Sequence, residues 1–284
     1  MWSSVRDGIP RALTQSPLRM DEDFVQSRLH LEDGQSMCLN YRRKYGTACT
    51  ACRKDEYDWS VPQLERSESQ SSLRSLLDEA ARGRFPPADG RVAVEPPPVG
   101  KFEAVIGFTA FHVIASSVPE SEVRGRLDPD DLGAPLKAPF LAWLADRLQT
   151  TPGMLDVVLA AIGTGKSPTP NFLVQREEWA DHPRIRRALH YRSQVSVYTD
   201  ASSRGVLILG RGLADRYEVS IEVDQAGRGR GLARSLLSAA RSLLPVGQPL
   251  FAQVPPGNAA SLRAFLAAGF RPIGAEVLFL REQQ

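Results

Sequence analysis

A glycine-rich run separates a strand-like segment from a helix-like segment late in the chain: Gln225-Ala-Gly-Arg-Gly-Arg-Gly-Leu-Ala233. Alternate glycines let the backbone approach a ligand closely, and a helix that begins at once leaves its first N–H groups without partners. Such N–H groups, at the positive end of a helix dipole, bind anions such as phosphate. The run is therefore a candidate phosphate cradle, with Arg228 and Arg230 adding positive charge at its rim.

Three other interpretations of the run compete with a cradle. A flexible arginine–glycine tract that touches RNA normally carries interleaved aromatic residues, and this short run has none. A dinucleotide-binding turn needs the spacing G-x-G-x-x-G and an acidic residue about 20 positions on, and both are missing here. A tight strand-to-helix turn with no ligand stays open on this run alone.

A second motif follows about 25 residues later: Asn258-x-x-Ser261-x-x-x-Phe265-x-x-x-Gly269-Phe270. In this order and spacing, the two motifs resemble those of the GCN5-related N-acetyltransferase (GNAT) superfamily. The resemblance covers residues 205–281. It implies an α/β chain with a mixed sheet of the GNAT-like acyl-CoA N-acyltransferase type, and acetyl-CoA as co-substrate.

The resemblance also assigns roles to residues. The backbone of Ile221 and Val223 would pair with the pantetheine arm where two parallel strands splay apart, and Asn258 would meet that arm near the thioester. Asn258 is equally a good helix N-cap. The amides that would bind the pyrophosphate belong to six consecutive residues: Arg228, Gly229, Arg230, Gly231, Leu232 and Ala233.

Acyl transfer to an amine needs a base for the ammonium proton and often an acid for the leaving thiolate. Where many relatives place an acidic tyrosine, this chain has Phe265, and where some place a glutamate it has Gln253. Glu218 is the candidate base, although Tyr217 holds the matching position. The alternative for Glu218 is a solvated strand residue. We expect His112 to be a core residue and no metal to be bound.

The surrounding periodicity indicates the elements that position these residues. We expect one strand at 104–116, a buried element at 155–162, and a hairpin of 194–200 with 206–212. The remaining expected strands are 217–223, 249–254 and 270–280, and the expected helices are 73–84, 138–149, 182–192, 232–244 and 258–269. The segment 104–200 is compatible with the family's opening strand–helix–helix–strand.

Composition places the chain among globular proteins. Of 284 residues, 42% are hydrophobic, and the net charge of +2 gives no case for nucleic-acid binding. We expect a polar, mostly disordered extension over 1–100, with a proline-rich linker at 86–100, and a domain over 101–284. No apolar run is long enough to span a membrane. All three cysteines lie early in the chain, at Cys38, Cys49 and Cys52, and read as free thiols or an incomplete metal site.

The sequence therefore predicts a cytoplasmic N-acetyltransferase that moves an acetyl group from acetyl-CoA to a primary amine of a small molecule or peptide. For the first 20 residues, a weak mitochondrial presequence is the alternative to a disordered terminus. The rival function is a GNAT-like domain that binds acyl-CoA as a sensor or scaffold without turnover. The sequence leaves the acceptor, the acid and the oligomeric state open.

Overall fold

The computed structural model describes residues 73–166, 172–177 and 182–281. They belong to a compact unit that spans Ser67–Gln284. The predictions about residues 1–72, including their disorder and the state of the three cysteines, lie outside the described residues.

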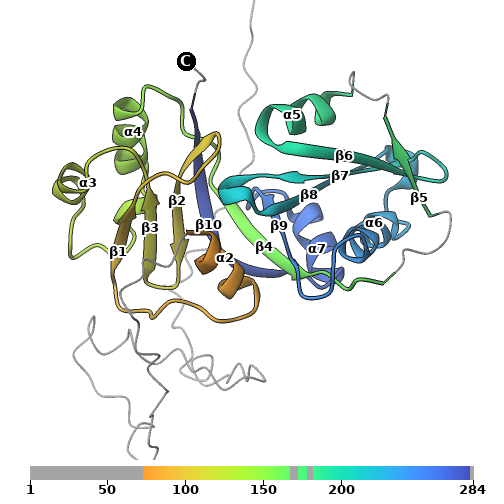
Figure 1. The fold of residues 1–284 in the computed structure, drawn as a ribbon, viewed down its shortest axis with the longest axis horizontal. Helices are drawn as coiled ribbons and strands as arrows, with labels where there is room; N and C mark the ends of the chain where they lie inside the picture. Colours follow the sequence, from red (N-terminus) through yellow and green to blue (C-terminus); the bar gives the residue numbers. More distant parts are fainter. Residues whose placement is uncertain (1–72, 167–171, 178–181, 282–284) are drawn as a thin grey trace, which may run out of the picture. The chain divides into compact units, whose positions relative to one another are not determined.

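In the described residues, ten strands form one mixed sheet in the order β1-β3-β2-β10-β4-β9-β8-β7-β6-β5 (Figure 1). Neighbouring strands are antiparallel except for the pairs β1/β3 and β8/β9, which are parallel. The predicted fold class, an α/β chain with a mixed sheet, is confirmed. The strands are β1 (Val92–Glu95), β2 (Phe102–Phe108), β3 (Phe111–Ala115), β4 (Asp156–Ile162), β5 (Leu173–Arg176), β6 (Ser193–Asp200), β7 (Gly205–Arg211), β8 (Tyr217–Val223), β9 (Pro249–Val254) and β10 (Arg271–Leu280).

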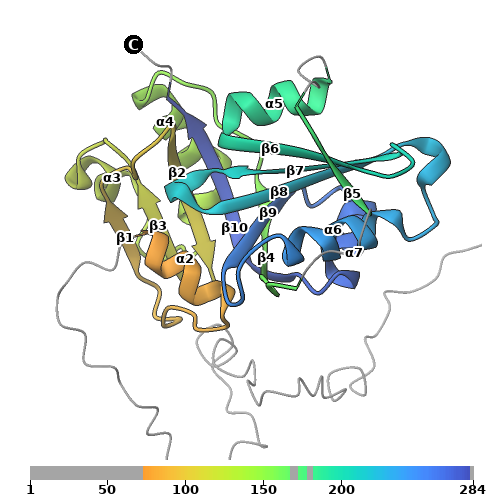
Figure 2. The same ribbon diagram turned by 45° about the vertical axis from the view of Figure 1, so that its right-hand side comes forward.

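Helices cover both faces of this sheet (Figures 1 and 2). α6 (Leu232–Ser242) and α7 (Ala259–Ala267) pack on the face that carries Leu159, whereas α2 (Leu73–Ala81) packs on the face that carries Val158. Successive residues of a strand point to opposite faces of the sheet, so Val158 and Leu159 of β4 mark the two faces. The other helices are α3 (Glu120–Arg126), α4 (Ala138–Arg147) and α5 (Pro183–Tyr191). No helix in the described ranges has the length and apolarity to cross a bilayer.

Most elements of the motif-bearing part match the sequence prediction. β6 to β10, α6 and α7 lie within two residues of their expected bounds, and so do α4 and α5 earlier in the chain. These segments have clear periodicity and polar or glycine ends, which is why their type could be read from the residues alone.

Two predictions about the earlier part need correction. The predicted single strand at 104–116 is the hairpin β2/β3, whose turn contains Ala110 at φ 48°. Both strands of this hairpin are buried throughout, so no change of polarity marks the turn. β1 lies inside the segment predicted as a linker and pairs with β3. The compact unit consequently begins before the predicted boundary at residue 101.

The buried element expected at 155–162, whose type the sequence left open, is β4. β4 inserts between β9 and β10, and β10 continues to β2 on its other side. The order of β2, β3, α3, α4 and β4 is compatible with the expected strand–helix–helix–strand, and these strands belong to the same sheet as those of the motif-bearing residues. The short elements α3 and β5 carry too few periodic residues and were not predicted.

The turn between β7 and β8 is strained. Ala214 and Asp215 have φ values of 51° and 58°, in the left-handed region that costs a residue with a Cβ about 1–2 kcal/mol. Arg74 of α2 donates its Nη1 hydrogen bonds to the carbonyl oxygens of both residues, and Arg211 also donates to Asp215 O at 3.0 Å. The first helix of the unit thus holds the turn that leads into β8.

Replacing Arg74 with methionine tests this clamp, because methionine keeps the aliphatic packing and removes both hydrogen bonds. We expect the free energy of unfolding to fall by about 1–3 kcal/mol, measured by urea denaturation. In contrast, Ala214→Gly relieves backbone strain and should raise the free energy of unfolding by up to about 1 kcal/mol. As a control, Arg84→Met removes an exposed ion pair with Glu79 and should leave stability unchanged. Equal effects of Arg74→Met and Arg84→Met would contradict the clamp.

Candidate functional site

β8 and β9 form a fork. They are parallel neighbours, yet within the described chain a single ladder pair, Glu218 with Phe251, joins them. That pair lies near the start of each strand, so the strands diverge toward their carboxyl ends at Val223 and Val254. The inner edges of both strands keep backbone N–H and C=O groups for another extended partner. In an α/β sheet such a crevice at the carboxyl ends is where ligands bind.

The glycine-rich turn begins where β8 ends. The side chain of Asp224 accepts a hydrogen bond from Gly227 N, which fixes the first part of the turn. Gly229 and Gly231 follow with φ values of 72° and 79°, a conformation that glycine adopts without steric cost. A Cβ added to either glycine would have no heavy atom of the described chain within 4 Å, so this side of the turn is open.

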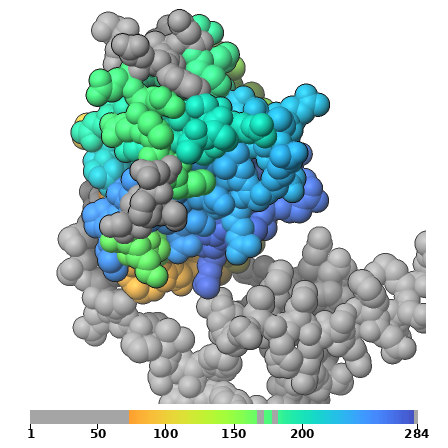
Figure 3. Space-filling model, turned by 90° about the vertical axis from the view of Figure 1, so that its right-hand side faces the viewer, coloured from red at the N-terminus to blue at the C-terminus, as the bar shows by residue number. Residues whose placement is uncertain are grey.

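Gly231 is the N-cap of α6 and offers no side chain to the first turn of the helix. The amides of Leu232 and Ala233 therefore point out of the helix end without a capping group. Figure 3 shows the face of the unit on which the light-blue residues of this turn and of α6 reach the surface. The exposed Arg228 and Arg230 lie in the same turn. Open glycines, uncapped amides and two arginines fit a pyrophosphate group.

The second motif lies at the neighbouring strand end. Asn258 follows β9 and caps α7, with Oδ1 accepting from Ser261 N at 3.1 Å. The N-cap interpretation is therefore confirmed, while contact with a cofactor arm stays a prediction. Phe265 packs in the core edge-to-face on Phe270, with ring centroids 4.9 Å apart. Its side chain belongs to the core that α6 and α7 form on the sheet.

Of the remaining predicted cofactor residues, Ile221 and Val223 lie in the half of β8 that has left its ladder with β9. Both still pair with β7 on the other side, so the strand is held straight beside the gap. The structure thus brings the two backbone positions, the glycine turn and Asn258 to one edge of the sheet.

A buried ion-pair network lies at the closed end of the fork. Arg216, which is fully buried, donates to both carboxylate oxygens of Glu276 on β10 and, through Nε at 2.9 Å, to Glu218 on β8. Arg192 Nε donates to the other oxygen of Glu218 at 3.0 Å. Gln253 Nε2 joins the two carboxylates, at 2.8 Å from Glu218 and 3.0 Å from Glu276. The network ties β8, β9 and β10 together across the sheet.

These contacts bear on Glu218 as the predicted base. Burial opposes its charge, but the guanidinium groups of Arg216 and Arg192 outweigh that effect and hold the pKa of Glu218 below its usual value. Both oxygens are already hydrogen-bonded, and Gly212 packs directly over the carboxylate. This is the environment of a structural ion pair and does not favour proton uptake from a substrate.

Asp156, which the sequence analysis missed, has the opposite environment. It begins β4 and pairs in register with Glu276. Its Oδ1 is buried and has no hydrogen-bond partner in the described chain. Burial is the main cause that raises the pKa of Asp156 to about 6, and the nearby charges of Glu276 and Glu218 add to it, while Arg187 opposes it. An aspartate at a strand start carries no sequence signal of this kind.

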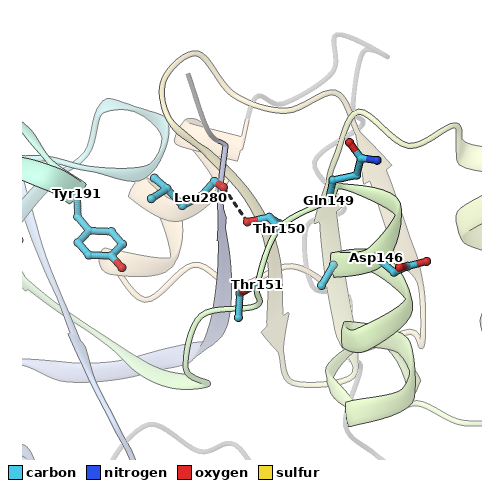
Figure 4. A pocket seen from close by; sticks show the side chains of 7 residues that line it. Asp146, Gln149, Thr150, Thr151, Tyr191 and Leu280 are labelled. Atoms are coloured by element: carbon cyan, nitrogen blue, oxygen red, sulfur yellow. Dashed lines mark hydrogen bonds between the residues drawn. The ribbon is translucent and has the colours of Figure 1, made fainter. Parts of the chain in front are cut away.

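A cavity of about 630 Å³ lies between the end of α4, the end of α5 and the end of β10 (Figure 4). Thr150 donates its hydroxyl to Leu280 O at 2.9 Å in its wall, and Tyr191 of α5 faces it from the opposite side. The lining is largely polar: Ala145, Asp146, Gln149, Thr150, Thr151, Tyr191 and Leu280. A second cavity of about 550 Å³ lies between α2, residues 95–100 and the β7–β8 turn.

No protein-family model matches the chain, and no curated protein matches it. Among solved structures, it is similar to a GCN5-related N-acetyltransferase from Kribbella flavida, at 14% identity and a TM-score of 0.32, over 51% of this chain and 65% of that chain. A GNAT-family acetyltransferase from Colwellia psychrerythraea is 14% identical, with a TM-score of 0.31, over 51% of this chain and 63% of that chain.

A functionally unknown protein from Staphylococcus epidermidis gives 12% identity and a TM-score of 0.34, over 52% of this chain and 68% of that chain. The first two neighbours belong to the superfamily that the sequence motifs resemble, and the match spans just under two thirds of their length. The TM-scores of these three neighbours are all below 0.5.

The ion-pair network predicts the result of Arg216→Met. Two buried carboxylates lose their main partner, so we expect the free energy of unfolding at pH 7 to fall by about 3–5 kcal/mol. The lowered pKa of Glu218 stabilises the wild type above the ordinary glutamate pKa, and that contribution disappears as pH falls through the folded value. The deficit of the variant should therefore shrink as pH falls below the ordinary glutamate pKa of about 4.3, in denaturation measured at several pH values.

The double variant Arg216→Met/Glu276→Gln is the companion measurement, because it removes one of the two stranded charges. We expect it to recover part of the lost stability at pH 7. If Arg216 and Glu276 do not interact, the two losses in the free energy of unfolding add. The double variant would then be less stable than Arg216→Met by as much as Glu276→Gln lowers the stability of the wild type.

Proposed function

We propose that this protein transfers an acetyl group from acetyl-CoA to a primary amine. One observation carries the proposal: the open fork of β8 and β9 and the uncapped, glycine-rich start of α6 lie at the same sheet edge. A fork suits an extended, amide-containing arm, and the turn suits a pyrophosphate. Acetyl-CoA carries both groups at opposite ends of one chain.

In this proposal different residues bind the two parts of acetyl-CoA. The amides from Arg228 to Ala233 and the two arginines of the turn would hold the pyrophosphate, and the inner edge of β8 at Ile221 and Val223 would pair with the arm. Bound acetyl-CoA supplies an activated thioester. The protein would hold that thioester between β8 and β9, the two strands that carry Ser220 and Gln253 at the margin of the ion-pair network.

A non-catalytic acyl-CoA-binding protein is the second candidate. The position of Phe265 in the core and the engagement of Glu218 and Gln253 in ion-pair contacts favour it, because these residues then offer neither an acid nor a base. This candidate predicts acetyl-CoA binding without turnover.

The test uses the full chain and two nearly isosteric variants, Gly231→Asp and Gly231→Asn. Both side chains tolerate the left-handed backbone of this N-cap, so they differ mainly in charge. By calorimetric titration with acetyl-CoA, we expect Asp to weaken binding at least about tenfold more than Asn, because a carboxylate at the turn repels the pyrophosphate. Acetylation of a panel of primary amines is then measured by release of free CoA thiol.

The outcomes separate the candidates. Binding that depends on charge at position 231, together with thiol release that requires an amine, supports the transferase. The same binding without thiol release for any amine supports the sensor. If the folded wild type does not bind acetyl-CoA, both candidate functions are wrong. The glycine run would then be a strand-to-helix turn that binds no ligand.

A further inference from the structure

Two polar side chains stand level with each other on the two sides of the fork. Ser220 on β8 and Gln253 on β9 each lie two residues past the ladder pair of Glu218 and Phe251. Because side chains alternate along a strand, both point to the face that carries Val158, opposite α6 and α7. Both are half-buried. We call Ser220 and Gln253 the cross-fork pair.

The contacts of Gln253 fix the orientation of its amide. Its Nε2 donates to Oε1 of Glu218 at 2.8 Å and to Oε1 of Glu276 at 3.0 Å. An ionised carboxylate only accepts, so both amide hydrogens are used and Oε1 of Gln253 points away from the two glutamates. Among the described residues, no donor bonds this oxygen. Gln253 therefore presents a fixed, uncharged acceptor at the fork.

The hydroxyl of Ser220 complements it as a donor. Its Oγ accepts from Nη1 of Arg192 at 3.1 Å, and the same guanidinium donates through Nε to Glu218 at 3.0 Å. The side chain of Arg192 is only 9% exposed, so its contact with Ser220 is largely shielded from water. Within the described chain, the hydrogen of this hydroxyl has no acceptor, which leaves it for a ligand.

The length of the pantetheine arm would bring its sulfur to this pair. Between pyrophosphate and sulfur the arm is about as long as four extended residues, roughly 14 Å. With the pyrophosphate at the turn after Val223, four residues of β8 lead back to Ser220, and the ladder pair closes the fork just beyond. The thioester would then lie level with the cross-fork pair.

The carboxylates around the pair are poor bases for this position. Both oxygens of Glu218 and both of Glu276 accept hydrogen bonds from guanidinium groups. Asp156 lies one strand farther from β8, beyond the carboxyl end of β9, because Val157 pairs with Val254. In the part of the chain that the structure describes, a thioester at this level would therefore face uncharged hydrogen-bonding groups.

We propose that the acceptor is a weakly basic amine that enters the fork uncharged, that Oε1 of Gln253 binds its N–H group, and that the Ser220 hydroxyl donates to the departing sulfur. An amide oxygen binds an N–H group without removing its proton, so an ammonium ion would find no base here. An amine with a pKa of about 8 is partly uncharged at neutral pH, whereas one of about 10.4 is not. This inference rests on the proposed function.

The proton and electron balance follows from these contacts. The nitrogen lone pair attacks the thioester carbon, and a C–N bond forms. The C–S bond breaks with its electron pair on sulfur, where the hydrogen bond from Ser220 stabilises the thiolate. Nitrogen loses one proton to water and sulfur takes one from water, so the products are the acetamide and the CoA thiol.

The pH dependence of the wild-type rate tests the class of amine. The probes are glycinamide and 4-aminobutanamide, whose amines resemble an α-amino group and a lysine, with pKa values of about 8 and about 10.4. Only the neutral fraction should react. From pH 7 to pH 9 we therefore expect kcat/KM, measured by release of CoA thiol, to level off for glycinamide and to rise about 100-fold for 4-aminobutanamide.

The charged groups around the pair leave this pH range clear. They are the ion-pair network, Glu222 with Arg184 and His182 at the start of α5, and Asp156 with Arg187. Carboxylates and imidazoles ordinarily titrate below about pH 7, and guanidiniums above about pH 12. The same inflection for both amines, or an inflection near pH 6 that disappears in Asp156→Asn, would identify a base in the protein and overturn the proposal.

Binding of CoA tests Ser220 without any acceptor. Because the hydroxyl favours the thiolate, the preference of wild type for CoA over desulfo-CoA should increase about tenfold from pH 6.5 to pH 9, in calorimetric titrations. Ser220→Ala should lose this increase and lower kcat for glycinamide about tenfold, whereas Ser220→Thr keeps the hydroxyl and should retain both. Ser196→Ala, at a half-buried serine of β6, is the matched control and should change neither. Equal pH dependence in wild type and Ser220→Ala would overturn the role of Ser220.

Gln253→Met tests the acceptor oxygen, because methionine keeps the length of the side chain. It should raise the KM for glycinamide at least about tenfold and leave the Kd of acetyl-CoA within about threefold. The variant also loses two hydrogen bonds to glutamates, so the constants are compared at a temperature where it is folded. Parallel increases in KM and Kd would assign Gln253 a structural role and overturn its contact with the amine.

The two levels of the proposal fail in different ways. Wild type that does not bind acetyl-CoA, or that binds it and releases no thiol with any amine, overturns the proposed transferase. Turnover with the wrong dependence on pH overturns the neutral-amine inference alone.

Discussion

The contact between Arg216 and two buried glutamates determines how the centre of the sheet is built. A guanidinium with no exposure to solvent must have all its charge compensated, and Glu218 and Glu276 do this from two strands that are not neighbours. Gln253 on β9 fills the remaining donor position between them. Because these groups require one geometry, they fix β8, β9 and β10 relative to one another at the closed end of the fork.

The fork depends on that anchor. Two parallel strands that separate after one ladder pair would gain hydrogen bonds by closing. Here the network holds them at one end, the glycine turn redirects β8 into α6 at the other, and α6 and α7 pack on one face of the sheet. The opening is therefore a property of the packed unit. Outside the network, Asp156 Oδ1 is buried without a hydrogen-bond partner in the described residues, unlike the paired oxygens of Glu276.

The sequence predicted the last third of this architecture well and its centre poorly. Gly231, Asn258 and the alternation of β8 are local signals, because a helix start, a cap or a strand face is decided within a few residues. Two of the three partners of Glu218 in the described residues are not local. Arg192 is 26 residues away and Gln253 is 35 residues away, and no spacing rule connects them to Glu218. The turn at Ala110 and the insertion of β4 were missed for the same reason, since packing by distant segments determines both.

The position of β10 has a consequence for how the chain is made. This strand is the last element, and it pairs with β2 on one side and with β4 on the other. During synthesis both of those strands leave the ribosome long before their shared partner, so one edge of each has no native partner until residues 271–280 emerge. Unpaired apolar edges of this kind attract other chains. The sheet therefore cannot close around β2 and β4 until residues 271–280 have left the ribosome, and the yield in cells should depend on chaperones that shield these two strands in the meantime.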